Sequence, residues 1–289
     1  MIMAQPAIVA EDLTYRYGDL TAVDHISFQV EEGEIIGMLG PNGAGKTTTV
    51  MMLTGQIRPA EGRARVLGMD IVKETKQIQR HIGVTFETTN LYEQLNAVEN
   101  LQLFARLYGV RADIRDLLEK VGLAGREKER VANYSKGMKQ RLMVARAMLH
   151  NPRILFLDEP THGLDPVSSR TIHTLIQEAA ERGTAVFLTT HDMMEADKLC
   201  HRVAFINQGK IVALDTPAAL KLRYGKRALR VEVEAPDGRV TTHEIPLDGS
   251  DGIQELAMLA QRGRILTVHS EEATLEDIFI QLTGRGLVG

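Results

Sequence analysis

The chain has 289 residues, of which 44% are hydrophobic and 25% are charged, and its formal net charge is −4. This length fits one large or two unequal globular domains, and the acidic balance argues against a general affinity for nucleic acid. No apolar run is long enough to cross a bilayer, and residues 1–6 lack the basic region of a signal peptide, so we expect a cytosolic protein. The single cysteine, Cys200, excludes an intrachain disulfide and is expected in the core.

Two short strands are expected at the start of the chain. Residues 8–14 and 22–30 alternate apolar and polar side chains, with Gly18 and Asp19 at the turn, which predicts an antiparallel pair. Tyr17 lies just before that turn. Its ring is placed either to pack in the sheet or, if a nucleotide binds nearby, to stack on a purine base.

The segment at residues 40–48 matches the phosphate-loop pattern G-x-x-x-x-G-K-[ST], between an expected strand and an expected helix. Its glycines permit positive φ, so backbone N–H groups can surround a polyphosphate at the helix N-terminus. We expect Lys46 to contact the β- and γ-phosphates and the Thr47 hydroxyl to ligate Mg²⁺. The predicted nucleotide-binding residues of this loop are Gly40, Pro41, Asn42, Gly43, Ala44, Gly45, Lys46, Thr47 and Thr48.

The middle of the chain is predicted to be largely helical. A polar helix is expected at residues 73–81, and a buried strand at 82–86 leads to Glu87. Helical spacing of apolar residues over 97–123 is typical of core packing. Ser135 is expected to cap the next helix at its N-terminus.

Two further buried strands are expected to end in chemically active side chains. The apolar run 154–157 leads to Asp158 and Glu159, and the run 185–190 leads to His191. We expect Asp158 to ligate Mg²⁺ and Glu159 to accept a proton from an attacking water. His191 is placed to bond the γ-phosphate or that water, because ligands of α/β sheets bind at the carboxyl ends of the strands.

The pattern changes at about residue 222. Strands at 228–234 and 239–245, joined by a turn at 236–238, are followed by a helix, a strand and a helix. This ββαβα unit carries no phosphate loop and no metal-ligand or nucleophile motif. We predict a first domain at residues 1–221 and a small non-catalytic domain at 222–289.

Over residues 8–220 these motifs resemble, in order, those of the ATP-binding subunits of ABC transporters. Tyr17 matches the adenine-stacking aromatic, residues 40–48 the Walker A loop, and residues 154–159 the Walker B strand with its catalytic glutamate. Residues 134–138 match the signature loop and residues 163–166 the D-loop, while His191 matches the switch histidine. The resemblance adds Ser135, Gly137 and Asp165 to the expected nucleotide-binding residues.

The resemblance implies an α/β fold of the P-loop NTPase type: a mixed core sheet, an antiparallel subdomain and a helical subdomain at about residues 90–150. The last segment is similar to the small α+β domain of ATPases that serve ABC-2-type exporters of the drug-resistance and sodium-efflux class. The resemblance implies ATP and Mg²⁺ as cofactors and a dimer of two ATPase subunits. It also implies a separate membrane permease, which would hold the chain at the inner face of the membrane.

Two departures from the family pattern stand out. The signature loop, usually L-S-G-G-Q, reads Y-S-K-G-M, but it keeps the serine and the second glycine that phosphate recognition needs. The family's Q-loop glutamine is replaced by Glu87, an additional candidate for the catalytic and Mg²⁺-binding sets. Its extra negative charge near phosphates predicts slower or more Mg²⁺-dependent hydrolysis.

Three functions are compatible with these motifs. The first is the ATPase that powers an exporter. The second is a soluble ABC-type ATPase acting on nucleic acid or ribosomes, which the single uninterrupted copy and the absence of a basic stripe disfavour. The third is a catalytically idle regulatory subunit, which the presence of Lys46, Asp158, Glu159 and His191 disfavours.

Overall fold

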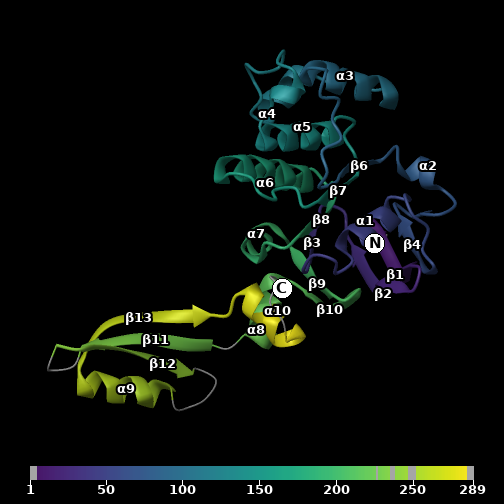
Figure 1. Ribbon diagram of the computed structural model, residues 1–289. Coiled ribbons are helices and arrows are strands. Elements are labelled where there is room, and N and C mark those ends of the chain that lie inside the picture. The colour runs from purple at the N-terminus through teal and green to yellow at the C-terminus, as the bar shows by residue number, and fades with distance from the viewer. Residues whose placement is uncertain (1–4, 226, 235–237, 247–251, 285–289) are drawn as a thin grey trace. The chain divides into compact units, whose positions relative to one another are not determined.

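The computed structural model describes residues 5–225, 227–234, 238–246 and 252–284. It divides into two compact units, Met1–Leu214 and Asp215–Leu287 (Figure 1). The domain boundary after residue 221 stays a prediction. Of the predicted turn at 236–238, Pro236 and Asp237 lie outside the described residues.

A six-stranded sheet forms the centre of the first unit. Its strands are β3 Ile35–Leu39, β6 Ile82–Thr85, β7 Ile154–Asp158, β8 Ala185–Thr190, β9 Arg202–Asn207 and β10 Lys210–Asp215. They lie in the order β10-β9-β3-β8-β7-β6, and the pairs from β9 to β6 are parallel. Every residue of β3, β7 and β8 is buried, as expected for central strands covered on both faces.

A second, antiparallel sheet has the order β2-β1-β4-β5. Its strands are β1 Ile8–Tyr17, β2 Leu20–Val30, β4 Glu61–Val66 and β5 Met69–Asp70. The predicted antiparallel pairing of the first two strands is confirmed. Phe28 of β2 stacks on Phe187 of β8, with ring centroids 5.6 Å apart, so the two sheets share one apolar core.

Helices α1 Lys46–Leu53 and α2 Thr75–Ile78 both contact strands of this antiparallel sheet. The predicted helix at 73–81 is therefore wrong in length. The backbone N–H groups of Val72 and Lys73 donate to the Asp70 carboxylate, and the Asp70 N–H donates to Glu74. These side-chain hydrogen bonds hold residues 70–74 in a turn, and the helix begins only after it.

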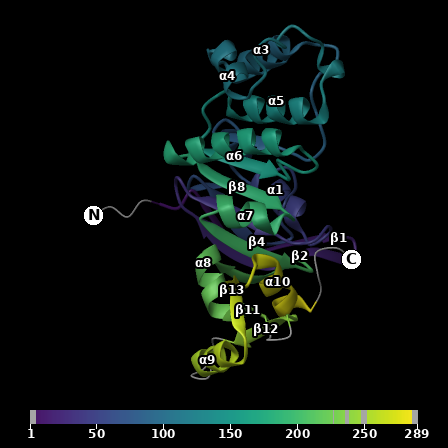
Figure 2. The ribbon, with the colours of Figure 1, turned by 90° about the vertical axis from the view of Figure 1, so that its left-hand side faces the viewer.

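The helical subdomain comprises α3 Ala97–Tyr108, α4 Ile114–Lys120, the 3₁₀ helix η1 Val131–Asn133 and α5 Lys136–Met148. The predicted cap is confirmed, since the Ser135 hydroxyl accepts the Met138 N–H at 3.2 Å. Two more helices, α6 Pro166–Glu181 and α7 Met193–Leu199, follow β7 and β8. Figure 2 shows α5 between the α3–α4 pair and α6. Cys200, which follows α7, is buried as expected.

The second unit begins with α8 Pro217–Tyr224 and has the predicted ββαβα order after it. Its elements are β11 Arg227–Glu234, β12 Val240–Pro246, α9 Gly252–Arg262, β13 Arg264–Glu272 and α10 Leu275–Thr283. The antiparallel sheet β12-β11-β13 packs against α9 through a small core of Val231, Val233, Ile245 and Leu259. Of all the helices that the structure describes, none is long and apolar enough to cross a membrane.

Candidate active site

Parallel strands bring four of the predicted site residues to one edge of the central sheet. β3, β8, β7 and β6 are neighbours in that order. Gly40 follows β3, His191 follows β8, Asp158 ends β7, and Glu87 lies shortly after β6. Because parallel strands point the same way, their carboxyl ends form a single edge where a ligand can meet all four positions.

The phosphate loop is a tight turn between β3 and α1. Gly43 and Gly45 have φ values of 79° and 108°, in the region where a side chain is strained. A Cβ on Gly40 would lie 2.2 Å from the Ile206 carbonyl oxygen, so that position requires glycine. Asn42, Gly43 and Thr47 are exposed, whereas Ala44, Lys46 and Thr48 are buried. The first turn of α1 has no side-chain cap, which leaves its N–H groups available to an anion.

Lys46 connects this loop to the end of β7. Its side chain is only 6% exposed, and its Nζ donates to the carbonyl oxygens of Gly40 at 2.6 Å and Pro41 at 3.3 Å. The same ammonium lies 3.2 Å from Oε1 of Glu159 in a buried ion pair. A phosphate entering the loop would offer this cation an acceptor of opposite charge in place of backbone carbonyls.

Asp158 is held by two hydroxyl groups. Thr47 donates to Oδ2 at 2.9 Å, and Thr189 of β8 donates to Oδ1 at 2.5 Å. The carboxyl is 1% exposed, and its burial raises its pKa above the ordinary value although the two hydroxyl bonds act in the opposite direction. A carboxylate and a hydroxyl oxygen close together suit Mg²⁺, which prefers hard oxygen ligands. A bound cation would also favour the ionised carboxylate.

Glu159 adopts an unusual backbone conformation, with φ at 49°. Its N–H donates to the Thr189 backbone oxygen and hydroxyl, both at 3.1 Å, and these bonds hold the left-handed turn. Its side chain is 8% exposed, and Oε2 lies 2.9 Å from Nδ1 of His191. The turn therefore directs a buried carboxylate toward both Lys46 and His191.

In the described part of the chain, Tyr17 and Glu87 form no hydrogen bond or ion pair with Lys46, Asp158 or Glu159. Tyr17, the last residue of β1, is 49% exposed and packs edge-on against Tyr15. Glu87 is exposed, and within the described residues no contact joins its carboxylate to the phosphate loop. The sequence predicted that Glu87 lies at the sheet edge, but it did not predict a side-chain partner for the Glu87 carboxylate.

Ser135, Gly137 and Asp165 form a second group at the starts of α5 and α6. The Asp165 carboxylate accepts the N–H groups of Val167 and Ser168, and the Ser168 hydroxyl at 2.7 Å. These bonds lower the pKa of Asp165. A Cβ on Gly137 would lie 2.9 Å from the Ser168 hydroxyl, so the two helix starts pack closely. In the described part of the chain, no hydrogen bond or ion pair connects this group to Lys46 or Glu159.

A buried network that was not predicted lies behind the sheet edge. Glu195 of α7 is 7% exposed and accepts hydrogen bonds from Thr161 at 2.5 Å, Thr190 at 3.0 Å and His173 at 2.5 Å. Burial raises the pKa of Glu195, but the three hydrogen bonds outweigh it and the pKa lies below its ordinary value. The network connects the loop after β7 to the end of β8, so it braces the segments that carry Glu159 and His191.

Comparisons with known protein families and with individual proteins give concordant results. A family model described as ABC transporter matches residues 23–162. A fluoroquinolones export ATP-binding protein of Mycobacterium tuberculosis is 45% identical over 95% of this chain and 92% of its own length. The bacitracin transport ATP-binding protein of Bacillus licheniformis is 37% identical over 98% of this chain and 99% of its own.

Solved structures show the same fold. The ATP-binding subunit of an ABC transporter matches with a TM-score of 0.70 and 29% identity, covering 75% of this chain and 93% of its own. A dimeric ATP-binding cassette in a post-hydrolysis state, bound to ADP and Pi, matches with a TM-score of 0.67 and 25% identity. That match covers 72% of this chain and 98% of the cassette.

Proposed function

This chain is an ATP-binding protein of the ABC transporter family, and on that premise we propose that it hydrolyses ATP with Mg²⁺ to power an ABC-2-type exporter. The observation that carries the proposal is the connected set of side chains at one sheet edge. Lys46 contacts Glu159, Glu159 contacts His191, and Thr47 contacts Asp158. This set combines a phosphate-binding cation, a proton acceptor and hard oxygen ligands.

The phosphate loop is assigned to the polyphosphate of ATP. Residues 40–48 would surround the β- and γ-phosphates with N–H groups, and Lys46 would transfer its hydrogen bonds from Gly40 and Pro41 to phosphate oxygens. Tyr17 is half-exposed, which leaves one ring face for the adenine.

The metal-binding residues proposed here are Thr47, Asp158 and Glu87. Thr47 and Asp158 fit the role because their oxygens already lie 2.9 Å apart. Mg²⁺ supplies charge neutralisation for the phosphate oxygens when it is bound. Glu87 is assigned as a third oxygen donor because it follows β6, the strand beside β7.

Glu159 is assigned as the general base. Its carboxylate is buried and positioned by the Thr189 bonds, so it can accept a proton from a water molecule held at the sheet edge. His191, bonded to that carboxylate through Nδ1, orients it, and in the imidazolium form it can also donate to the γ-phosphate from Nε2. Lys46 completes the catalytic set by stabilising charge on the phosphate that departs.

A second copy of this chain is the proposed partner at the nucleotide. Ser135, Gly137 and Asp165 lie at helix starts that make no described contact with the phosphate loop of their own chain. Helix N-termini attract anions, so this group suits the γ-phosphate held by a facing subunit. The dimeric cassette among the similar structures is consistent with such an arrangement.

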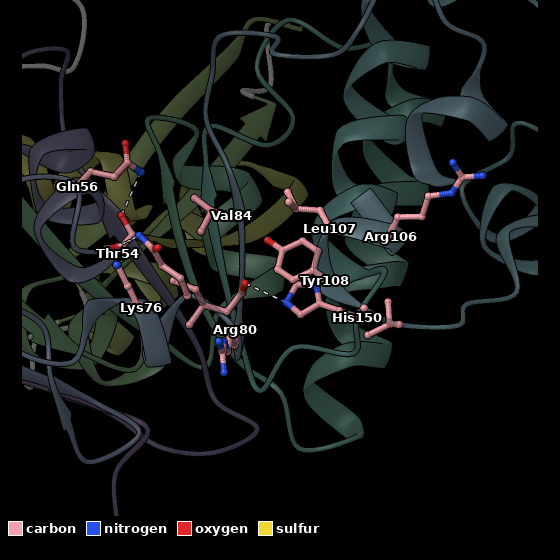
Figure 3. Close-up of a pocket in the computed structure, with 13 residues that line it drawn as sticks. Thr54, Gln56, Lys76, Arg80, Val84, Arg106, Leu107, Tyr108 and His150 are labelled. Atoms are coloured by element: carbon pink, nitrogen blue, oxygen red, sulfur yellow. Dashed lines mark hydrogen bonds between the residues drawn. The ribbon is translucent and has the colours of Figure 1, made fainter. Parts of the chain in front are cut away.

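A pocket of about 750 Å³ in the first unit is the proposed docking surface for the permease (Figure 3). It lies between the α2–β6 region and the end of α3, and Figure 3 shows Lys76 and Arg80 on one side and the Tyr108–His150 ring stack on the other. Lys76, Arg80 and Arg106 line it, and no Asp or Glu is among its lining residues. A cytoplasmic permease segment that carries a carboxylate fits this charge.

The names of the relatives support export of a drug or antibiotic, and the permease would hold the protein on the cytoplasmic face of the membrane. With a formal net charge of −4, nucleic acid is not a proposed partner. Residues 222–289 are proposed as an accessory domain that carries no catalytic group.

The testing experiment is a pull-down of tagged Glu159→Gln protein with ATP from detergent-solubilised membranes, with partners identified by mass spectrometry. A multi-span membrane protein is the expected partner. Recovery of only ribosomal or nucleic-acid machinery would replace the exporter function by the soluble ATPase.

The docking surface is tested in the same assay with a Lys76→Glu/Arg80→Glu variant. We expect it to lose the permease while it still hydrolyses ATP. Lys73→Glu, an exposed change just outside the pocket lining, is the matched control and should retain the permease.

A further inference from the structure

Three metal-ligating side chains meet at the sheet edge. Glu159, His162 and His191 each offer one ligand atom, and these atoms all lie within 4.8 Å of one another. The His162 N–H donates to the Glu159 carbonyl oxygen at 3.3 Å, closing a turn that brings both side chains to one side of the loop after β7. The rings of His162 and His191 meet edge-on with centroids 4.9 Å apart.

The Glu159 carboxylate has unused bonding capacity. Glu159 is only 8% exposed, and its Oε1 atom has no hydrogen-bond partner in the described structure. Lys46 Nζ lies 3.2 Å from that oxygen, which satisfies the charge of the pair but not the angles of a hydrogen bond. A buried carboxylate oxygen without a donor favours an additional cation.

The donor set indicates which metal fits. Two imidazoles and one carboxylate form the three-protein-ligand set of open zinc sites, which keep a fourth position for water or substrate. Mg²⁺ prefers oxygen ligands in octahedral geometry, so it is poorly matched to two histidines. The exposure of His162 opens the cluster to solvent and lets its ring adjust by rotation.

We propose that Glu159, His162 and His191 bind a transition-metal ion of the Zn²⁺ class, and that the occupied site cannot hydrolyse ATP. The second part of this proposal, inhibition of ATP hydrolysis, rests on the proposed function. Coordination occupies the carboxylate that accepts a proton from water, and it replaces the hydrogen bond between Glu159 and His191. The ammonium of Lys46 opposes the ion, so affinity is lower than at an all-protein structural zinc site.

Metal binding is measured directly on nucleotide-free protein by titration with Co²⁺, which reports tetrahedral coordination through its visible absorption. Wild-type protein should bind one ion with tetrahedral intensity. His162→Asn should bind roughly tenfold or more weakly because one ligand is lost. His269→Asn removes an exposed histidine of the second unit and should titrate like wild type. No tetrahedral signal, or an unchanged titration for His162→Asn, would overturn the proposal.

A second assay separates this proposal from the proposed function. Zn²⁺ at fixed Mg²⁺ should inhibit the ATPase of wild type and His269→Asn, whereas His162→Asn should keep its basal rate and resist Zn²⁺ by roughly tenfold or more. If the protein has no ATPase activity, the Co²⁺ titration still decides the metal site. An active ATPase with the same Zn²⁺ sensitivity in all three proteins would reject the metal site and leave the ATPase function standing.

Discussion

Two parts of the candidate site differ in how completely a single chain builds them. At the sheet edge, Lys46, Glu159 and His191 contact one another directly, and Thr47 contacts Asp158. At the helix starts, the side chains of Ser135 and Asp165 accept backbone N–H groups of their own helices and so act as N-caps. Under the proposed function, the sheet edge binds the nucleotide within one chain, whereas the helix starts reach a nucleotide only in a second subunit.

The largest effect is expected for Glu159→Gln at the sheet edge. Loss of the proton acceptor should lower kcat by roughly 100-fold to 10,000-fold, because general-base catalysis contributes on that scale. ATP binding should persist, since the phosphate loop is unchanged. Steady-state ATPase assays and nucleotide titration calorimetry measure the two quantities. A rate near that of wild type would assign the proton acceptor to another group.

Glu195→Gln tests the brace behind the sheet edge. The amide replaces one of the two acceptor oxygens by an NH₂ group, so at least one of the three donors loses its acceptor, and the free energy of unfolding should fall by about 1–3 kcal/mol at neutral pH. The pKa of Glu195 is depressed in the folded state, so its contribution is present above the ordinary value of 4.5 and is lost as the pH falls through the folded value. The difference between wild type and variant should therefore shrink on acidification.

Chemical denaturation at pH 7 and at pH 4 measures this difference. Glu178→Gln on α6, a half-buried position outside this network, serves as the control and should leave stability nearly unchanged. A difference between wild type and Glu195→Gln that grows on acidification would contradict the pKa direction.

Ser135→Ala separates capping from phosphate recognition. Loss of the cap should cost about 1 kcal/mol of stability. Thr216→Ala removes a cap of the same kind from α8 in the second unit. Both variants should lose similar stability, but only Ser135→Ala should lose ATPase activity. Equal ATPase rates in the two variants would remove Ser135 from the nucleotide site.

The smallest effect is expected for Glu87→Gln. Removing one exposed negative charge near phosphates should change the rate by less than about tenfold and shift the Mg²⁺ concentration needed for half-maximal activity. A Mg²⁺ titration of the ATPase measures the shift, with Glu119→Gln on α4 as the control. Unchanged kinetics would mean that Glu87 is a loop residue only.

The sequence predicted those features that depend on neighbouring residues. The glycine pattern identified the phosphate loop, and apolar runs located the strand that ends at Asp158 and the strand that His191 follows. Thr189 and Glu195 could not be predicted, because their roles depend on contacts between segments that lie far apart in the chain. No role was predicted for His162, because only the turn between Glu159 and His162 shows that both side chains meet His191.

The central claim is that two copies of this chain complete the nucleotide site, and sedimentation of Glu159→Gln protein tests it most directly. With Mg²⁺ and ATP the protein should sediment as a dimer, without nucleotide as a monomer, and the added change Ser135→Arg should abolish the dimer while ATP still binds. A monomer that holds ATP, or a dimer that Ser135→Arg leaves intact, would contradict the claim.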